Sequence, residues 1–281
     1  MMAGTSPIEN LLSRDRIIIG FSIGIIFLIA VVYTVLGIGM PMSAIKMTAM
    51  SGPAGMPGVS EGQSMHAAGM MMPARWSATY AVLVFFMWWI MMIAMMLPSV
   101  ASTVLLYSAL LRRGSQSGDA ARYALYFVTG YLLAWSFFSL LATITQWLLE
   151  LRGLVSPNTM TLTSHIIAGG VLVFAGIYQF TPWKHACLEH CRSPLQFLTE
   201  RRRSGSNGAL VMGLEHGTFC LGCCWFLMML LLVGGVMNLY WIAGLTFIVV
   251  VEKLIKHGDK VAYVTGVLMT GTGTYLLAFA G

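Results

Sequence analysis

The chain has 281 residues, of which 58% are hydrophobic and only 9% are charged. A soluble domain carries roughly 25% charged residues, so this composition excludes an ordinary soluble enzyme and indicates a membrane protein. The net charge of +6 is explained by orientation in the membrane and by attraction to anionic lipid. We therefore expect the lipid bilayer as a partner and no nucleic acid.

Runs of about 18 or more apolar residues mark membrane spans. Seven segments are predicted to span, namely residues 17–38, 79–111, 123–149, 165–180, 210–236, 239–256 and 261–280. The first follows Arg14 and Arg16 but is too long for a signal peptide, so we expect it to be retained. The predicted fold is an all-α, polytopic bundle of about seven transmembrane helices.

Basic residues predict the orientation of this bundle. With the N-terminus inside, the cytoplasmic segments hold 13 of the 16 Lys and Arg residues, which leaves Lys46, Arg75 and Arg152 outside. The positive-inside rule favours this asymmetry, with the N-terminus in and the C-terminus out. The predicted inner loops are 112–122 and 181–209, and the predicted outer loops are 39–75 and 150–164.

The predicted domains follow from these spans. They are a cytoplasmic segment 1–16, a first span 17–38, a flexible Met-rich outer loop 39–78 and a six-helix metal-binding membrane domain 79–281. Gly, Ser, Pro and Ala separate the methionines of the outer loop, so this loop cannot build a core. Its clustered thioethers suit weak capture of Cu(I), and an incidental low-complexity segment is the alternative.

A stripe of soft metal ligands lies within the fifth predicted span. Its members recur every four residues, which keeps them on one slanted helix face with a drift of about 40° per step. The stripe consists of Met212, His216, Cys220, Cys224 and Met228, with Cys223 beside it. Thiolates, thioethers and imidazoles favour Cu(I), or Zn(II) where thiolate and imidazole dominate.

All five cysteines fall in the fifth span or in the loop before it. Cys187 and Cys191 stand one helical turn apart in that loop, close to His185 and His190. On the reducing side of a membrane, paired cysteines more often bind metal or do redox work than form structural disulfides. We predict that both cysteine groups converge on one four-ligand tetrahedral site. Packing as small hydrophobic side chains, or a dithiol redox centre, remains open.

The second span carries a further group of thioethers. Met87, Met91 and Met95 repeat every four residues, as do Met92 and Met96. A stripe of this kind is usually packing, because methionine fills irregular cores. By predicted depth, however, Met91 and Met95 are level with Met228 of the fifth span, which makes all three candidate ligands.

Two further features modify these spans. Pro98 stands near the middle of the second span, where it predicts a kink or a helix that runs well into the cytoplasm. Glu215 lies one turn inside the fifth span, where a carboxylate is costly unless it is paired. We expect Lys253 or a metal ion to be its partner.

Several motifs of the chain resemble those of a bacterial family with a domain of unknown function. They are Ala94-Met-Met-Leu-Pro98, Tyr178-Gln-Phe-Thr-Pro-Trp-Lys-His-Ala-Cys187-Leu-Glu-His-Cys191-Arg-Ser-Pro194, Gly217-Thr-Phe-Cys220-Leu-Gly-Cys223-Cys224-Trp-Phe-Leu-Met-Met229 and Glu252-Lys253. The family's members are described as predicted metal-binding integral membrane proteins. The resemblance covers roughly residues 80–280 and implies the five cysteines as ligands and a bacterial inner membrane as the location, but it implies no reaction.

The leading hypothesis is an integral membrane protein that binds a soft metal and transports or delivers it. Copper as Cu(I) is the expected metal, with zinc as the alternative, and a metallochaperone or a second copy of the chain is a candidate partner. The alternatives are a membrane-embedded metalloenzyme or dithiol redox protein, and a structural subunit of a membrane complex. Nothing in the sequence resembles an ATP-binding loop, so transport would be passive, gradient-driven or partner-driven.

Overall fold

The computed structural model of the chain describes residues 7–38, 40, 43–51, 76–112, 117–157, 159–255 and 258–279. This part is helical throughout, and its only β-type pairing is an isolated bridge between Val155 and Leu162. The helices are α1 (Pro7–Leu36), α2 (Ala44–Ser51), α4 (Ala78–Arg112), η1 (Ser117–Asp119), α5 (Ala120–Leu151), α6 (His165–Gln179), α7 (Pro182–Arg192), α8 (Pro194–Glu200), α9 (Gly205–Met229), α10 (Leu231–Gly234), α11 (Leu239–Leu254) and α12 (Gly258–Phe279). The predicted all-α class is confirmed.

Five segments among the described residues are long and apolar enough to cross a membrane. They lie in α1, α4, α5, α9 with α10, and α12. A sixth span results if α6 and α7, which meet at a bend of 63°, are counted together. The remaining predicted span corresponds to α11, whose 16 residues are fewer than the roughly 20 that a span needs. The structure thus supports several spans without establishing seven.

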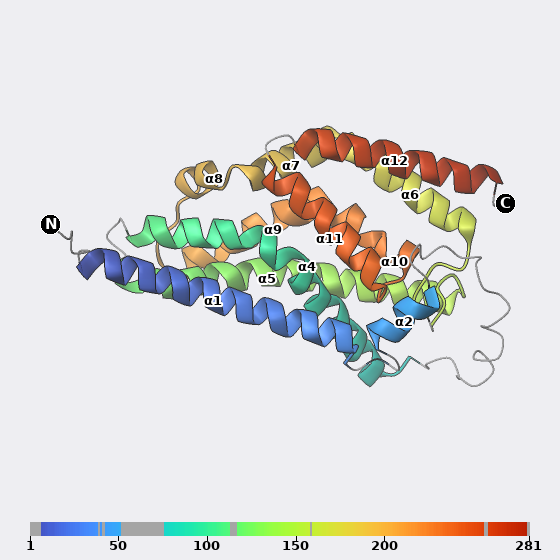
Figure 1. The fold of residues 1–281 in the computed structure, drawn as a ribbon, viewed down its shortest axis with the longest axis horizontal. Coiled ribbons are helices and arrows are strands. Elements are labelled where there is room, and N and C mark those ends of the chain that lie inside the picture. Colours follow the sequence, from blue (N-terminus) through green and yellow to red (C-terminus); the bar gives the residue numbers. More distant parts are fainter. Residues whose placement is uncertain are drawn as a thin grey trace.

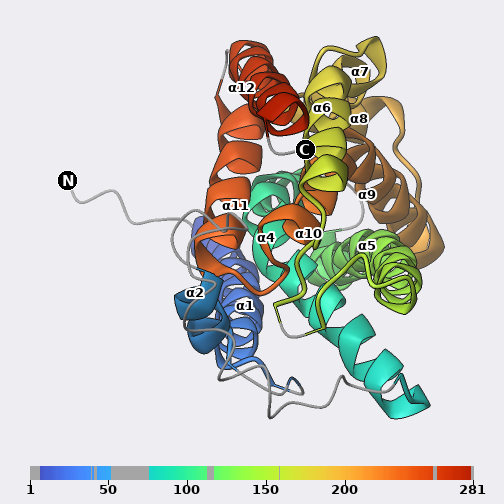
Figure 2. The ribbon, with the colours of Figure 1, turned by 90° about the vertical axis from the view of Figure 1, so that its right-hand side faces the viewer.

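The long helices run side by side along the length of the molecule (Figure 1). Helix α4 packs against α1 and α5, and α5 packs against α9. Helices α6 and α12 form a second layer along one edge, and α11 crosses between the layers from α10 towards α7. In the end-on view of Figure 2, α4 lies near the middle of the bundle. It stays one helix of 35 residues through Pro98.

Small residues let α5 and α9 pack with their backbones almost in contact. A Cβ atom at Gly213 of α9 would collide with the carbonyl group of Phe127 on α5. One turn later, a Cβ atom at Gly217 would lie 2.6 Å from the Cβ of Ala134. Close backbone approach through small residues is the usual way that membrane helices gain packing energy. It also brings Tyr131 of α5 directly against the cysteine-bearing face of α9.

Helices α6 and α12 of the second layer also pack closely through small residues. On α6 and α12, glycines spaced seven residues apart face each other, so that a Cβ at Gly273 would lie 2.7 Å from the carbonyl oxygen of Gly169. At the other crossing, a Cβ at Gly266 would lie 2.8 Å from the Cβ of Gln179. These contacts hold the end of α6, and the first residues of α7 beyond it, close to α11 and α12.

Part of the predicted flexible outer loop is a helix. In α2, Ala44 and Met47 are buried, and the hydroxyl of Thr48 accepts a hydrogen bond of 2.9 Å from the backbone of Leu239. Residues 44–51 therefore dock on the start of α11, and the expectation of a loop is wrong for them. Apolar side chains one turn apart form the buried face of this helix. The sequence analysis did not recognise this spacing, because many Gly and Pro residues nearby favoured a loop. The rest of the Met-rich stretch, residues 52–75, lies outside the described residues.

Candidate metal centre

The thiol of Cys220 is the best-connected group of the cysteine cluster. It lies 2.9 Å from the Nζ atom of Lys253 on α11 and 3.0 Å from the hydroxyl of Tyr131 on α5. All three side chains are buried. A buried ammonium group at this distance favours a negatively charged sulfur, because opposite charges attract strongly where water is excluded. Cys220 is thus suited to act as a thiolate ligand.

The other thiols lie on α9 and on the neighbouring α7. Those of Cys223 and Cys224 both donate to the Cys220 carbonyl oxygen, at 3.0 and 2.9 Å. Helix α7 packs against α9, and its Cys191 is half-buried against the same core. All of these are free thiols. That the loop cysteines converge with those of the fifth span on one site stays a prediction.

Cys187 takes a different position. Its sulfur lies against the backbone of Gly222, 2.8 Å from where a Cβ of that residue would be. Burial raises the pKa of this thiol in α7, which lies outside the predicted spans, so that the protonated form is favoured. Among the described residues, no three His, Cys, Asp or Glu side chains are arranged to hold a metal ion. The described residues thus do not form the predicted tetrahedral site, and the thiols of Cys223 and Cys224 donate instead to a backbone carbonyl.

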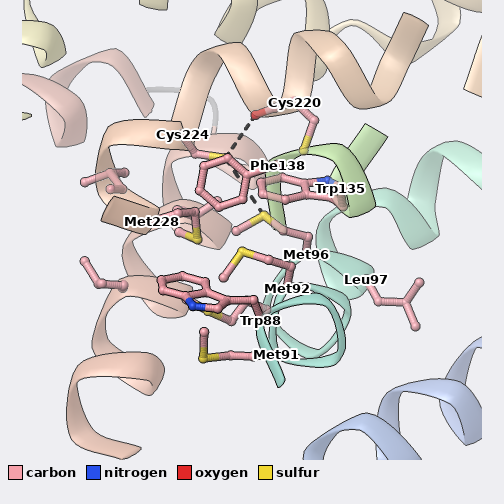
Figure 3. Packing of buried hydrophobic residues seen from close by; sticks show 14 of the residues in the cluster. Trp88, Met91, Met92, Met96, Leu97, Trp135, Phe138, Cys220, Cys224 and Met228 are labelled. Atoms are coloured by element: carbon pink, nitrogen blue, oxygen red, sulfur yellow. Dashed lines mark hydrogen bonds between the residues drawn. The ribbon is translucent and has the colours of Figure 1, made fainter. Parts of the chain in front are cut away.

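A second group of sulfurs continues from the cysteines into the middle of the bundle. The Cys224 thiol lies 3.9 Å from the Sδ atom of Met96 on α4. Figure 3 shows the sulfurs of Met92 and Met228 following that of Met96, with Met91 further on. All of these methionines are buried, as is Met95 on the same helix. The sulfur column, which we define as Cys220, Cys224, Met96, Met92, Met228 and Met91, joins α9 to α4.

Aromatic rings line this column. Trp135 and Phe138 of α5 pack edge to face beside the upper sulfurs, with their ring centroids 5.6 Å apart (Figure 3). Phe138 in turn meets the ring of Trp88 at 6.5 Å. Beyond Cys220, whose thiol contacts Lys253 and Tyr131, aromatic rings thus line the column, and sulfur is its soft electron donor.

A comparison with family models identifies where this chain belongs. Residues 85–276 match the family PpoB2, which is described as copper chaperone. The chain belongs to this family. Comparisons with curated proteins and with solved structures gave no match. The matched range contains every sulfur of the column and all five cysteines, whereas the outer methionine-rich residues 39–75 precede it.

The donor set suits the copper that the family name implies. Thiols and thioethers are the soft ligands that select Cu(I). Two thiolates around one Cu(I) ion carry a net negative charge, which the ammonium of Lys253 would balance beside Cys220. Cargo copper would thus find soft donors and a compensating charge in one buried place.

The histidines add two free nitrogen atoms near the cysteines. His216 of α9 is buried among aromatic rings, and its Nδ1 atom has no hydrogen-bond partner among the described residues. The Nε2 atom of His190 is likewise unpartnered, and its ring stacks on Phe219 at 3.8 Å. Burial lowers the pKa of His190, which favours the neutral imidazole that binds metals. His185 instead lies 3.7 Å from Asp259, away from the cysteines, in an ion-pair position.

Next to the cysteines, the structure contains a buried charge network that the sequence analysis missed. The ammonium of Lys184 lies 2.7 Å from Glu252, and both side chains are at most 2% exposed. Gln179 hydrogen-bonds to both, and its amide nitrogen lies 3.2 Å from the hydroxyl of Thr265. Lys184 and Lys253 were counted among the cytoplasmic charges, but both are buried in the protein. The adjacent Glu252-Lys253 pair inside an apolar segment was the signal that could have revealed the network.

Glu215 has different partners from those expected. Its carboxylate lies 2.6 Å from Arg203 and 3.8 Å from Arg201, two residues of the segment before α9. The side chain is 23% exposed, so this pair sits at the edge of the protein and not inside it. The expected pairing with Lys253 is wrong, because the bend between α8 and α9 brings the arginines back over the first turns of α9.

Proposed function

We propose that this protein binds Cu(I) inside the membrane and passes it between the thioethers of α4 and the cysteine cluster of α7 and α9. The observation that carries the proposal is the 3.9 Å contact between Cys224 and Met96, which joins the two groups of sulfurs into one column. Membership of a copper chaperone family supports copper as the metal. Delivery to an acceptor at the inner face would follow from the cysteine end.

The order of donors supports this transfer. Neutral thioethers hold Cu(I) weakly, and thiolates hold it more strongly, so an ion would move downhill from Met91 towards Cys220. Movement through a pore requires several sites of moderate strength, none of which holds the ion too tightly. At the cysteine end, the unpartnered nitrogen of His216 and the thiol of Cys191, on the α7 helix packed against α9, are candidate further donors.

The proposal includes the topology. We place α7 and α8 at the cytoplasmic face of a bacterial inner membrane and α2 at the outer face, with seven membrane segments if α6 and α11 are counted. At 1.5 Å per residue, α11 measures about 24 Å, less than the roughly 30 Å of hydrocarbon. Its inner end needs no contact with water, because Glu252 and Lys253 are paired within the protein.

Metal binding by the purified full-length protein tests the proposal. Under reducing conditions, the protein would compete with a chromophoric Cu(I) chelator, and bound copper and zinc would be counted. The double variant Cys220→Ser, Cys224→Ser should lose tight Cu(I) binding. Cys187→Ser is the matched control, because this thiol packs against the backbone of Gly222 and is not part of the sulfur column, so it should matter much less. Equal binding by the wild type and the double variant would overturn the proposed site.

Transfer needs a second measurement, since an enzyme could bind copper equally well. Vesicles that contain the protein and an internal Cu(I) indicator would be exposed to Cu(I) that is buffered outside. The wild type should raise the internal signal above that of empty vesicles. Stoichiometric Cu(I) binding without any transfer, with or without an added acceptor protein, would favour the metalloenzyme alternative.

A further inference from the structure

Trp88 lies within the sulfur column, between Met91 and the other sulfurs in the view of Figure 3. Its side chain is completely buried in the first half of α4. In Figure 3 the sulfurs of Met92 and Met228 lie on one side of its ring and that of Met91 lies on the other. The indole therefore borders the proposed path between these thioethers.

A buried glutamine fixes the orientation of this ring. The indole nitrogen of Trp88 donates a 2.8 Å hydrogen bond to Gln146 of α5, which is itself fully buried. Gln146 then donates to Glu150 at 2.8 Å, and Glu150 accepts another bond of 2.8 Å from Trp76. A buried amide is costly in an apolar core unless it is bonded on both sides. These three hydrogen bonds give both polar ends of the Gln146 side chain a partner, and they connect Trp88 with Trp76 at the start of α4.

Packing alone does not explain the arrangement, as two neighbouring tryptophans show. The indole nitrogen of Trp89, the next residue, donates to the backbone carbonyl of Leu132 without any dedicated side chain. Trp135 is as deeply buried as Trp88, yet its indole nitrogen has no partner among the described residues. The core therefore tolerates a buried indole without a glutamine. Among the tryptophans that the structure describes, Trp88, which faces the thioethers, is the one whose nitrogen is held by a fully buried side chain.

We propose that the indole face of Trp88 is part of a mid-membrane site for a soft monovalent cation, together with the sulfurs of Met91, Met92 and Met228. Gln146 is the positioning residue of this site. Thioethers are neutral, so a cation among them lacks a compensating charge. The negative face of an aromatic ring attracts cations, most strongly in tryptophan and in the absence of water. The inference rests on the proposed function and specifies how copper is held between the outer face and the cysteines.

Silver provides the test, because Ag(I) is a soft monovalent ion that does not change its oxidation state under these conditions. The full-length protein in detergent would be titrated with Ag(I) while indole absorption and fluorescence are recorded. The wild type should show a shifted indole band and quenching. In Trp88→Phe this spectral change should disappear, and the affinity of the corresponding step should fall about tenfold or more. Trp89→Phe is the matched control and should keep both.

The role of Gln146 has its own pair of variants. Gln146→Leu removes the acceptor for the indole nitrogen and should reduce the spectral change. Gln146→Glu keeps an acceptor at the same place and should restore it. A merely structural role would affect both variants through folding, which circular dichroism and gel filtration would reveal. If Trp88→Phe does not fold, this pair still decides the question.

The outcomes separate the two proposals. Ag(I) binding that depends on Cys220, with an identical indole signal in the wild type and in Trp88→Phe, would overturn the site at Trp88 and leave the proposed function standing. A signal lost in Trp89→Phe but kept in Trp88→Phe would also overturn it. The absence of any Ag(I) or Cu(I) binding by the wild type would overturn both proposals.

Discussion

The two ends of the sulfur column differ in the charged groups that lie beside them. Around Cys220, thiols meet the buried ammonium of Lys253, and the ion pair of Lys184 and Glu252 lies nearby. Around Trp88, the neighbours that Figure 3 labels are thioethers and aromatic rings. The cysteine end can hold an ion by charge balance, whereas the tryptophan end offers polarisable sulfur and ring faces, with the Gln146 amide bonded to the indole nitrogen. Strong retention at one end and weak, passing contact at the other is what the proposed delivery requires.

The largest effect should come from breaking the ion pair beside the cysteine end. Glu252→Gln would leave Lys184 buried without a countercharge and should cost roughly 3–5 kcal/mol of stability. Thermal unfolding in detergent would measure the loss. Glu215→Gln is the matched control, since this carboxylate is 23% exposed, pairs with arginines near the surface and should contribute at most about 1 kcal/mol. Equal losses of stability in the two variants would show that the buried ion pair contributes no more than the surface pair.

Removal of the charge beside Cys220 should weaken copper binding without a comparable loss of stability. In Lys253→Met, a Cu(I) ion between two thiolates would keep an unbalanced negative charge in a buried place. We expect the affinity for Cu(I) to fall roughly 10- to 100-fold, as for other residues that support metal ligands. Chelator competition would measure it. An unchanged affinity would mean that charge balance does not distinguish this end of the column.

Between the two ends, a change at Met96 should affect transfer more than stability. Met96→Leu keeps the volume of the side chain but removes the sulfur next to Cys224. The free energy of unfolding should change by less than about 1.5 kcal/mol, while copper transfer into vesicles should slow markedly. Met269→Leu on α12, a half-buried position outside the column, provides the comparison. Transfer that is equally fast in both variants would remove Met96 from the path.

The smallest effect should arise at the outer end, where α2 docks. Thr48→Val keeps the shape of the side chain but loses its hydrogen bond with the backbone of Leu239. A bond of this kind contributes about 0.5–1.5 kcal/mol. Hydrogen exchange at the start of α11 should become faster, while Cu(I) affinity at the cysteines should stay the same. A change in that affinity would show that the two ends are coupled.

Sequence patterns alone predicted the helices and the soft character of the site. Each predicted span has a helical counterpart, because long apolar runs have few other ways to satisfy their backbones in a membrane. The four-residue spacing of His216, Cys220 and Cys224 places all three on one buried face of α9, since helical periodicity is a local property.

The partners across helices had to come from the tertiary structure. Sequence alone did not show that Lys253 would meet Cys220 and not Glu215, that Cys187 would pack against Gly222, or that Met96 would touch Cys224. Such contacts depend on the angle and height at which two helices cross. Here the close approach at Gly213 and the bend between α6 and α7 set those values. The residue types therefore determined that soft metal ligands are present, and only the packing of the helices decided which of these side chains lie in contact.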